Sequence, residues 1–356
     1  MTRSEEITSM ISKKFFLDQY IYNDVYMRKD TQELEFCDCL VEFGSCYVVI
    51  QIKERNDEAQ TSADKWFKKK VLKVAKDKIK KTFDFFNDKA NVIFSKSSEL
   101  KVDRDKILIP VIVFVNSDID TYDRIVYSRS LDKDINIFSY DDFKKMLETI
   151  VIPYDILSYL VYRTVFKNDS PFVVFDEVDD NTTVLATPVN EEDYASLFLA
   201  RSYYRDISER KITEENIALY NHVISVLNEA RGGLRDSFAQ GLLFVDYVRA
   251  DSIGRNYGKL IELAQQEKYV EPYKVFTDDK VYMFLVRPNT VDLDDLLCTL
   301  ELSMIYCQYK NNCKFAHVIM FRKELEDKIA VELYDIDFST LRYDEFLNLA
   351  KEKYEE

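Results

Sequence analysis

The sequence predicts an α/β protein with two domains, and three observations support this prediction. The 356 residues are 47% hydrophobic, which is enough chain and enough apolar content for two domains with their own cores. Runs of β-prone residues alternate with segments whose apolar residues recur at helical spacing, as is typical of α/β folds. The polar stretch at residues 167–171 ends in proline and is the candidate linker. We therefore expect one domain over residues 1–166 and a second, helix-rich α/β domain over residues 172–356.

A β-hairpin centred on Gly44 and Ser45 is the clearest local feature. The flanking residues 35–43 and 46–55 are β-prone, and a Gly-X pair is typical of a type II′ turn between antiparallel strands. These two runs are expected to be the second and third strands of the first domain.

The other elements of the first domain follow from apolar periodicity and capping signals. In chain order they are a helix at 4–17, a short strand at 20–27, the hairpin, a helix at 64–86, strands at 107–115 and 135–138, a helix from Tyr140 with Ser139 as N-cap, and a helix after Pro153. The core order is therefore α-β-β-β-α-β.

The second domain is expected to begin with helices and to end as an α/β unit. Its expected elements are helices within 191–266, with Thr213 as an N-cap and Gly232 as a C′ residue, a hairpin through Asp278 and Asp279, a helix at 292–309, strands at 315–321 and 329–335, and a closing helix.

Composition excludes several classes of function. The net charge of −15 argues against a protein that coats nucleic acid through overall positive charge. Only six glycines occur, and none is placed to form a GxGxxG or GxxxxGK[ST] phosphate-binding loop. The only histidines, His222 and His317, form no HExxH motif, which excludes zincin chemistry.

The same composition predicts a cytoplasmic protein. Residues 1–20 are charged and lack the apolar segment of a signal peptide, and the longest apolar stretch, residues 107–115, is too short to span a bilayer. The six cysteines include no CxxC pair and suit a reducing compartment. We expect no membrane partner.

The hairpin brings together side chains that can carry chemistry. If Gly44 and Ser45 form the turn, the numbers of paired residues add up to 89, so Asp38 lies opposite Gln51 with Cβ atoms about 4.5–5.5 Å apart. Lys53 follows Gln51 by two residues and projects from the same face. A carboxylate and an amide oxygen can share a hard cation such as Mg²⁺, and a nearby ammonium group can orient the attacking water. The pattern predicts metal-dependent phosphodiester hydrolysis.

A run of lysines follows the hairpin. Residues 65–81 contain nine lysines and one acidic residue, Asp77, within a chain of net charge −15. Four of these lysines recur at spacings of 4, 3 and 4 and are expected to form one exposed row, namely Lys69, Lys73, Lys76 and Lys80. The row is a candidate nucleic-acid-binding surface, and an ordinary solvated helix face is the alternative.

These residues resemble a known family. Asp38, twelve intervening residues and then Gln51-Ile52-Lys53, within an α-β-β-β-α-β order, resemble the core of the PD-(D/E)XK restriction-endonuclease-like superfamily. The resemblance is to its Mrr-like branch, in which Gln replaces the acid of the ExK motif, and it covers residues 4–115. It implies that Asp38 is the main metal ligand, Gln51 the second ligand and Lys53 the catalytic lysine, with Mg²⁺ or Mn²⁺ as cofactor.

Further acidic ligands remain open at this point. The family carries an acid on its first helix, which here would be Glu5 or Glu6. Glu35 is the other upstream candidate metal ligand, although strand alternation places it on the opposite face from Asp38 unless a β-bulge intervenes. The sequence departs from the family at Cys37, where the family has proline, and at the amide that replaces the second acid.

The resemblance implies a metal-dependent nuclease that cuts DNA in preference to RNA, with a role in host defence or restriction. The second domain is expected to provide protein-partner binding, homo-oligomer formation or substrate choice. Two alternatives remain: a catalytically inactive interaction protein that keeps the fold as a scaffold, and an RNA-directed toxin nuclease. The lysine row does not distinguish DNA from RNA, because phosphate contacts carry no sequence information.

Overall fold

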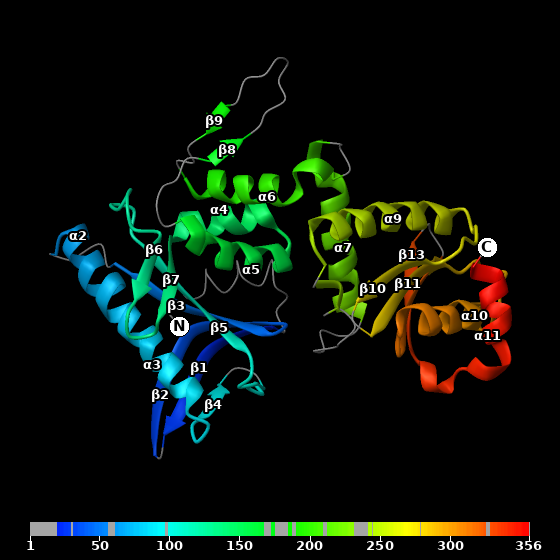
Figure 1. Ribbon diagram of the computed structural model, residues 1–356, viewed down its shortest axis with the longest axis horizontal. Helices are drawn as coiled ribbons and strands as arrows, with labels where there is room; N and C mark the ends of the chain where they lie inside the picture. Colours follow the sequence, from blue (N-terminus) through cyan, green and yellow to red (C-terminus); the bar gives the residue numbers. More distant parts are fainter. Residues whose placement is uncertain are drawn as a thin grey trace. The chain divides into compact units, whose positions relative to one another are not determined.

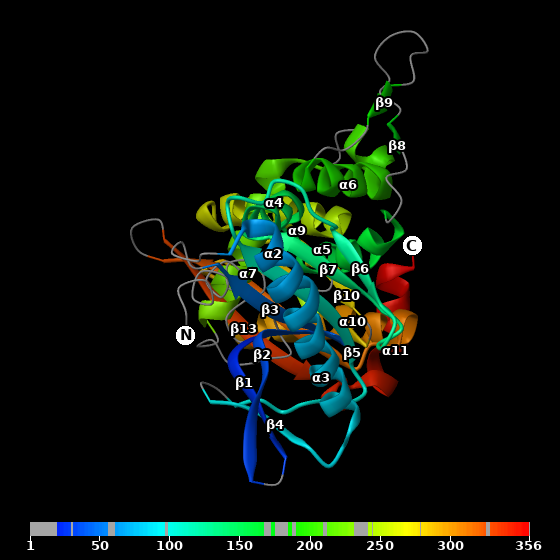
Figure 2. The same cartoon turned by 90° about the vertical axis from the view of Figure 1, so that its left-hand side faces the viewer.

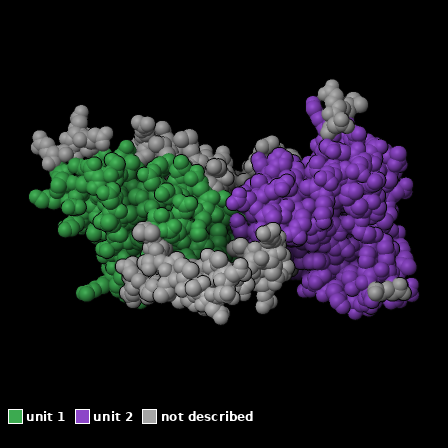
Figure 3. Space-filling model, turned by 90° about the horizontal axis from the view of Figure 1, so that it is seen from above, with its two compact units in different colours: residues 1–204 green, residues 205–356 purple. Residues whose placement is uncertain are grey.

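The chain forms two compact units, residues 1–204 and residues 205–356, which are coloured separately in Figure 3. The structure is a computed structural model. It describes residues 20–29, 31–55, 61–96, 99–166, 172–174, 184–186, 190–208, 212–230, 241–243, 245–277, 279–324 and 328–355. The expected helix at 4–17, the candidate linker at 167–171 and Gly232 lie outside the described residues.

The first unit is built on a mixed seven-stranded sheet in the order β4-β1-β2-β3-β5-β7-β6. The strands are β1 (Ile21–Lys29), β2 (Gln32–Phe43), β3 (Cys46–Glu54), β4 (Val92–Ser95), β5 (Ile107–Val115), β6 (Ile125–Ser128) and β7 (Lys133–Ser139). Strands β3, β5 and β7 are parallel, and the remaining pairs are antiparallel. The continuous apolar sequence of β5 suits this central, parallel position because such strands are buried on both faces. A short pair, β8 (Phe172–Val174) and β9 (Val184–Ala186), lies apart from the sheet.

One long helical segment covers one face of this sheet (Figure 2). It runs through α2 (Ala63–Trp66), a π-helical part η2 (Phe67–Ala75) and α3 (Lys76–Asn87), which confirms the helix expected at 64–86. Its apolar side chains, Val71, Ala75, Ile79 and Phe83 among them, pack in one core with side chains of β2, β3 and β5. The helix therefore fixes the face of β2 and β3 on which the candidate site lies.

Two helices lie on the opposite side of the sheet from this segment (Figure 1). They are α4 (Tyr140–Ile150) and α5 (Pro153–Tyr162), both at the expected positions. The hydroxyl of Ser139 accepts a hydrogen bond from the Asp142 amide at 3.1 Å, which confirms the expected N-cap. The first unit is thus a three-layer α/β structure.

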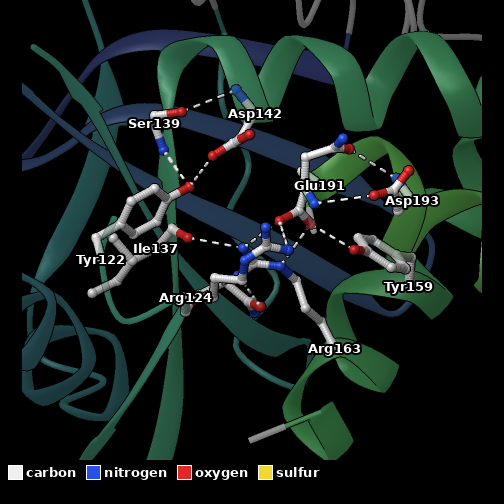
Figure 4. A network of polar contacts seen from close by, with 11 residues as sticks. Tyr122, Arg124, Ile137, Ser139, Asp142, Tyr159, Arg163, Glu191 and Asp193 are labelled. Atoms are coloured by element: carbon white, nitrogen blue, oxygen red, sulfur yellow. Dashed lines mark hydrogen bonds and ion pairs between the residues drawn. The ribbon is translucent and has the colours of Figure 1, made fainter. Parts of the chain in front are cut away.

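The next helix, α6 (Glu191–Ser208), is joined to the first unit by a buried ion pair. Glu191 lies beside Arg163, Tyr159 and Arg124 (Figure 4). The boundary between units falls at residue 204, directly after Tyr203, where the backbone of α6 leaves helical geometry. It therefore lies further along the chain than the expected boundary at residues 166–172, because Glu191 must stay with its buried partner.

The second unit is a smaller α/β structure. It contains α7 (Glu214–Ala230), α9 (Tyr247–Gln265), β10 (Tyr273–Thr277), β11 (Lys280–Val286), α10 (Leu293–Asn311), β12 (Phe315–Lys323), β13 (Ile329–Asp337) and α11 (Tyr343–Tyr354). Its sheet has the order β10-β11-β12-β13, with β11 and β12 parallel and α10 between them in sequence. The Thr213 hydroxyl accepts a hydrogen bond from the Asn216 amide at 3.2 Å, as expected of an N-cap. Throughout the described part of the chain, no helix has the length and apolar content needed to cross a membrane.

Candidate metal centre

The β2–β3 hairpin has the register that the sequence predicts. Gly44 adopts a positive φ of 54°, a conformation that glycine tolerates at low cost. The pairs run from Phe43 opposite Cys46 to Cys39 opposite Ile50, and each pair of numbers adds up to 89. The next side chains beyond this ladder are Asp38 on β2 and Gln51 on β3.

The side chain of Asp38 makes the next hydrogen bond between β2 and β3 beyond the last backbone pair. Its Oδ2 accepts a hydrogen bond from the Ile52 amide at 2.5 Å and lies 3.5 Å from the Nζ of Lys53. The residue is only 8% exposed, and the Lys53 side chain is 15% exposed. Asp38 and Lys53 are therefore held together as an ion pair at the edge of the core.

Gln51 is the most deeply buried member of the group. It is 1% exposed, and among the described residues its Oε1 has no hydrogen-bond partner. Strand alternation and the hairpin register place it on the same face as Asp38 and Lys53. A buried amide oxygen without a donor is costly, and such an atom is a suitable ligand for a cation.

A β-bulge brings Glu35 into the group. Val25 pairs with Cys37 but Tyr26 pairs with Glu35, so β2 carries one extra residue, Phe36, at this point. The Thr82 hydroxyl of α3 donates a hydrogen bond to the Phe36 carbonyl, which fixes the bulge against the helix. Because of this bulge, Glu35 lies on the same face of β2 as Asp38, whereas strict alternation would place it on the opposite face.

The pKa shifts show that the two carboxyl groups interact. Burial raises the pKa of Asp38 to about 6, although the charge of Lys53 opposes the shift. Burial alone would also raise the pKa of Glu35, but hydrogen bonds with Asp38 and Lys78 lower it overall. Two neighbouring acids whose pKa values move in opposite directions are typical of functional sites.

Lys78 is a member of this group that the sequence analysis missed. It lies on α3 and forms an ion pair with Oε2 of Glu35. The sequence signal for Lys78 was its position next to the apolar Ile79, at the margin of the apolar face of the helix. Lys78 does not belong to the predicted lysine row.

The predicted row is divided into two halves. Lys69 and Lys73 are exposed on the π-helical part, whereas Lys76 donates to the Tyr127 carbonyl at 3.4 Å and Lys80 pairs with Asp84 at 2.5 Å. The π-helix has i→i+5 hydrogen bonds and more residues per turn than an α-helix, so the 4, 3, 4 spacing does not trace a straight line along it.

The donor set fits a hard divalent cation. Across the described residues no three His, Cys, Asp or Glu side chains form a metal-binding group. The acidic side chains at this site are Glu35 and Asp38, which pair with Lys78 and Lys53. The orphaned oxygen of Gln51 adds a third protein oxygen, and Mg²⁺ keeps several waters and needs only one or two carboxylates. Glu5 and Glu6 lie outside the described residues.

No family model, no curated protein and no solved structure matches the chain.

Proposed function

We propose that the first unit is a PD-(D/E)XK-like nuclease that hydrolyses phosphodiester bonds with Mg²⁺ or Mn²⁺, with DNA as its substrate and a role in host defence or restriction. The observation that carries the proposal is the buried, unpartnered Oε1 of Gln51 on the same face as the Asp38–Lys53 ion pair. A buried acceptor without a protein partner calls for an explanation, and a bound ion is one that also accounts for the neighbouring carboxylates.

The metal ligands would be Asp38, Gln51 and Glu35, all of which offer oxygen atoms. A bound Mg²⁺ would polarise the scissile phosphate and lower the pKa of a water molecule. The ion pair with Asp38 fixes the ammonium group of Lys53 beside these ligands. Held there, Lys53 orients the attacking water and offsets the negative charge that develops on the phosphoryl oxygens.

Lys53 is also suited to take part in proton transfer. Burial is the main cause that lowers the pKa of Lys53, while the charge of Asp38 opposes the shift. In hydrolysis, the water oxygen bonds to phosphorus, the ester P–O bond breaks, and the water proton must leave as the ester oxygen gains one. A lysine with a lowered pKa exchanges protons more readily near neutral pH.

The exposed lysines of the helix would guide the substrate. Lys69 and Lys73 are exposed on the segment that covers this face of the sheet. They would attract a polyanion locally although the chain as a whole is acidic. The second unit would then bind a protein partner, form homo-oligomers or select the substrate.

A cleavage assay with matched variants tests the proposal. The purified full chain is incubated with plasmid DNA and with oligonucleotide RNA in Mg²⁺ or Mn²⁺, beside Lys53→Ala and Lys106→Ala. Lys106 is the matched control because its side chain is 13% exposed and pairs with Glu42 at 2.6 Å, next to the turn of the hairpin rather than at its Asp38 end. We expect cleavage by the wild type and by Lys106→Ala, and loss of at least 100-fold in rate for Lys53→Ala.

The other outcomes identify the rival functions. Cleavage of RNA alone would indicate the RNA-directed toxin nuclease. No cleavage of either substrate, together with no heat of metal binding in calorimetry, would favour a scaffold that binds partners without catalysis.

A further inference from the structure

Lys78 pairs with a carboxylate that is a candidate metal ligand. Its Nζ pairs with Oε2 of Glu35, one of the two carboxylates of the candidate centre. The ammonium group takes up acceptor sites on Oε2, and its positive charge repels a cation that binds either oxygen of the same carboxylate. Lys78 and a metal ion therefore compete for Glu35.

The ion pair is easily exchanged. The side chains of Lys78 and Glu35 are 38% and 39% exposed, and ion pairs with this much solvent contact contribute little to stability. The backbone around them is fixed, because Thr82, one turn beyond Lys78, donates to the carbonyl of the bulge residue Phe36. Exchange therefore requires only side-chain motion.

The released ammonium group would have an anion close by. Lys78 pairs with Glu35 and Lys53 pairs with Asp38, and the β-bulge places these two carboxylates on one face of β2. A phosphate drawn to Lys53 would thus lie within reach of both lysines.

We propose that Lys78 is an exchangeable counter-ion of the metal centre, which pairs with Glu35 in the metal-free protein and moves to the substrate phosphate when a divalent cation takes Glu35. This inference rests on the proposed function. In this role Lys78 positions the substrate phosphate, and it weakens metal binding while no substrate is bound.

Calorimetry with Mn²⁺ and Mg²⁺ on the full chain tests the first half. Lys78→Met should bind metal about two- to fivefold more tightly, which matches the modest strength of exposed ion pairs. Lys78→Glu adds a third carboxylate and should bind about tenfold or more tightly. The control is Lys144→Met, which removes another exposed Lys–Glu pair, on α4, and should leave the affinity unchanged.

Salt dependence of DNA binding tests the second half with Lys53 retained, in Ca²⁺, which takes oxygen ligands without the octahedral geometry that Mg²⁺ demands, and before cleavage proceeds. With metal present, Lys78→Met should reduce the slope of log K against log salt concentration by about one, the effect of one lost phosphate contact. Without metal the slope should not change, since Lys78 is then paired with Glu35. An equal change in both conditions would overturn the exchange.

The results also separate this inference from the proposed function. If the wild type binds metal and both Lys78 variants bind it equally or more weakly, the counter-ion role is wrong and the nuclease proposal stands. If neither the wild type nor Lys78→Glu binds metal, both are wrong.

Discussion

Arg163 and Glu191 form the most deeply buried ion pair among the described residues of the first unit, and removing the guanidinium group should destabilise that unit strongly. Arg163 is 2% exposed and Glu191 is fully buried, with Nε and Nη2 of the arginine each 2.8 Å from a carboxylate oxygen. The guanidinium group also donates to the Ile137 and Arg124 carbonyls at 3.0 and 2.6 Å. Breaking a buried pair by removing one partner costs about 3–5 kcal/mol. Because the Arg124 side chain also pairs with Glu191, at 3.2 Å, we expect Arg163→Met to cost about 3 kcal/mol.

Urea unfolding followed by tryptophan fluorescence measures this cost. Trp66 is the only tryptophan and is buried in the first unit, so its emission reports on that unit alone. Lys144→Met is the control, since Lys144 and Glu148 are both about half exposed and 3.9 Å apart, and it should change the free energy of unfolding by less than about 0.5 kcal/mol. Adding Glu191→Leu to Arg163→Met should recover part of the loss. A loss below about 1 kcal/mol for Arg163→Met alone would refute the reasoning and with it the role of this pair in attaching α6.

Two further predictions concern close packing and pH. A Cβ on Gly254 of α9 would lie 1.8 Å from the Asn216 carbonyl oxygen of α7, so Gly254→Ala should lower the free energy of unfolding of the second unit by more than about 3 kcal/mol. A Cβ on Gly258 would meet only a side chain, at 3.2 Å, so Gly258→Ala should cost less than about 1 kcal/mol. Thermal unfolding followed by circular dichroism compares the two, and equal losses would contradict the packing argument. Burial raises the folded-state pKa of Asp38 from 3.8 to about 6, so the protonated form is favoured on folding and stability should fall as pH rises through that interval. The lowered pKa of Glu35 acts in the opposite direction, so the net loss should stay below about 3 kcal/mol. Urea midpoints between pH 4 and pH 7 should show this slope in the wild type and a flatter one in Asp38→Asn, and parallel profiles would contradict it.

The elements that the sequence predicts well are those whose signals are local. The hairpin follows from one glycine and the alternation on either side of it, and its register is as predicted because the turn fixes the pairing of every later residue. The buried strand β5 is recognisable from nine residues without a charge. Helix α4 begins where Ser139 signals an N-cap.

The features that the sequence does not predict depend on partners distant in the chain. Strands β4 and β6 have four residues each and pair only at the two edges of the sheet, so neither carries a strong pattern of its own. The position of the unit boundary depends on Glu191, whose partner is 28 residues earlier. The bulge at Phe36 is visible only in the pairing of β2 with β1, and without it Glu35 would face away from Asp38.

The charges of the candidate centre give a physical reason for an amide at position 51. Two carboxylates, Glu35 and Asp38, face two ammonium groups, Lys53 and Lys78, so the four charges balance without any metal. Gln51 is 1% exposed, and a carboxylate there would add a buried negative charge with no counter-ion until a cation binds. A neutral amide supplies a ligand oxygen at a much smaller desolvation cost. The amide therefore favours stable folding in the absence of a cation, at the expense of electrostatic attraction for the Mg²⁺ that we propose.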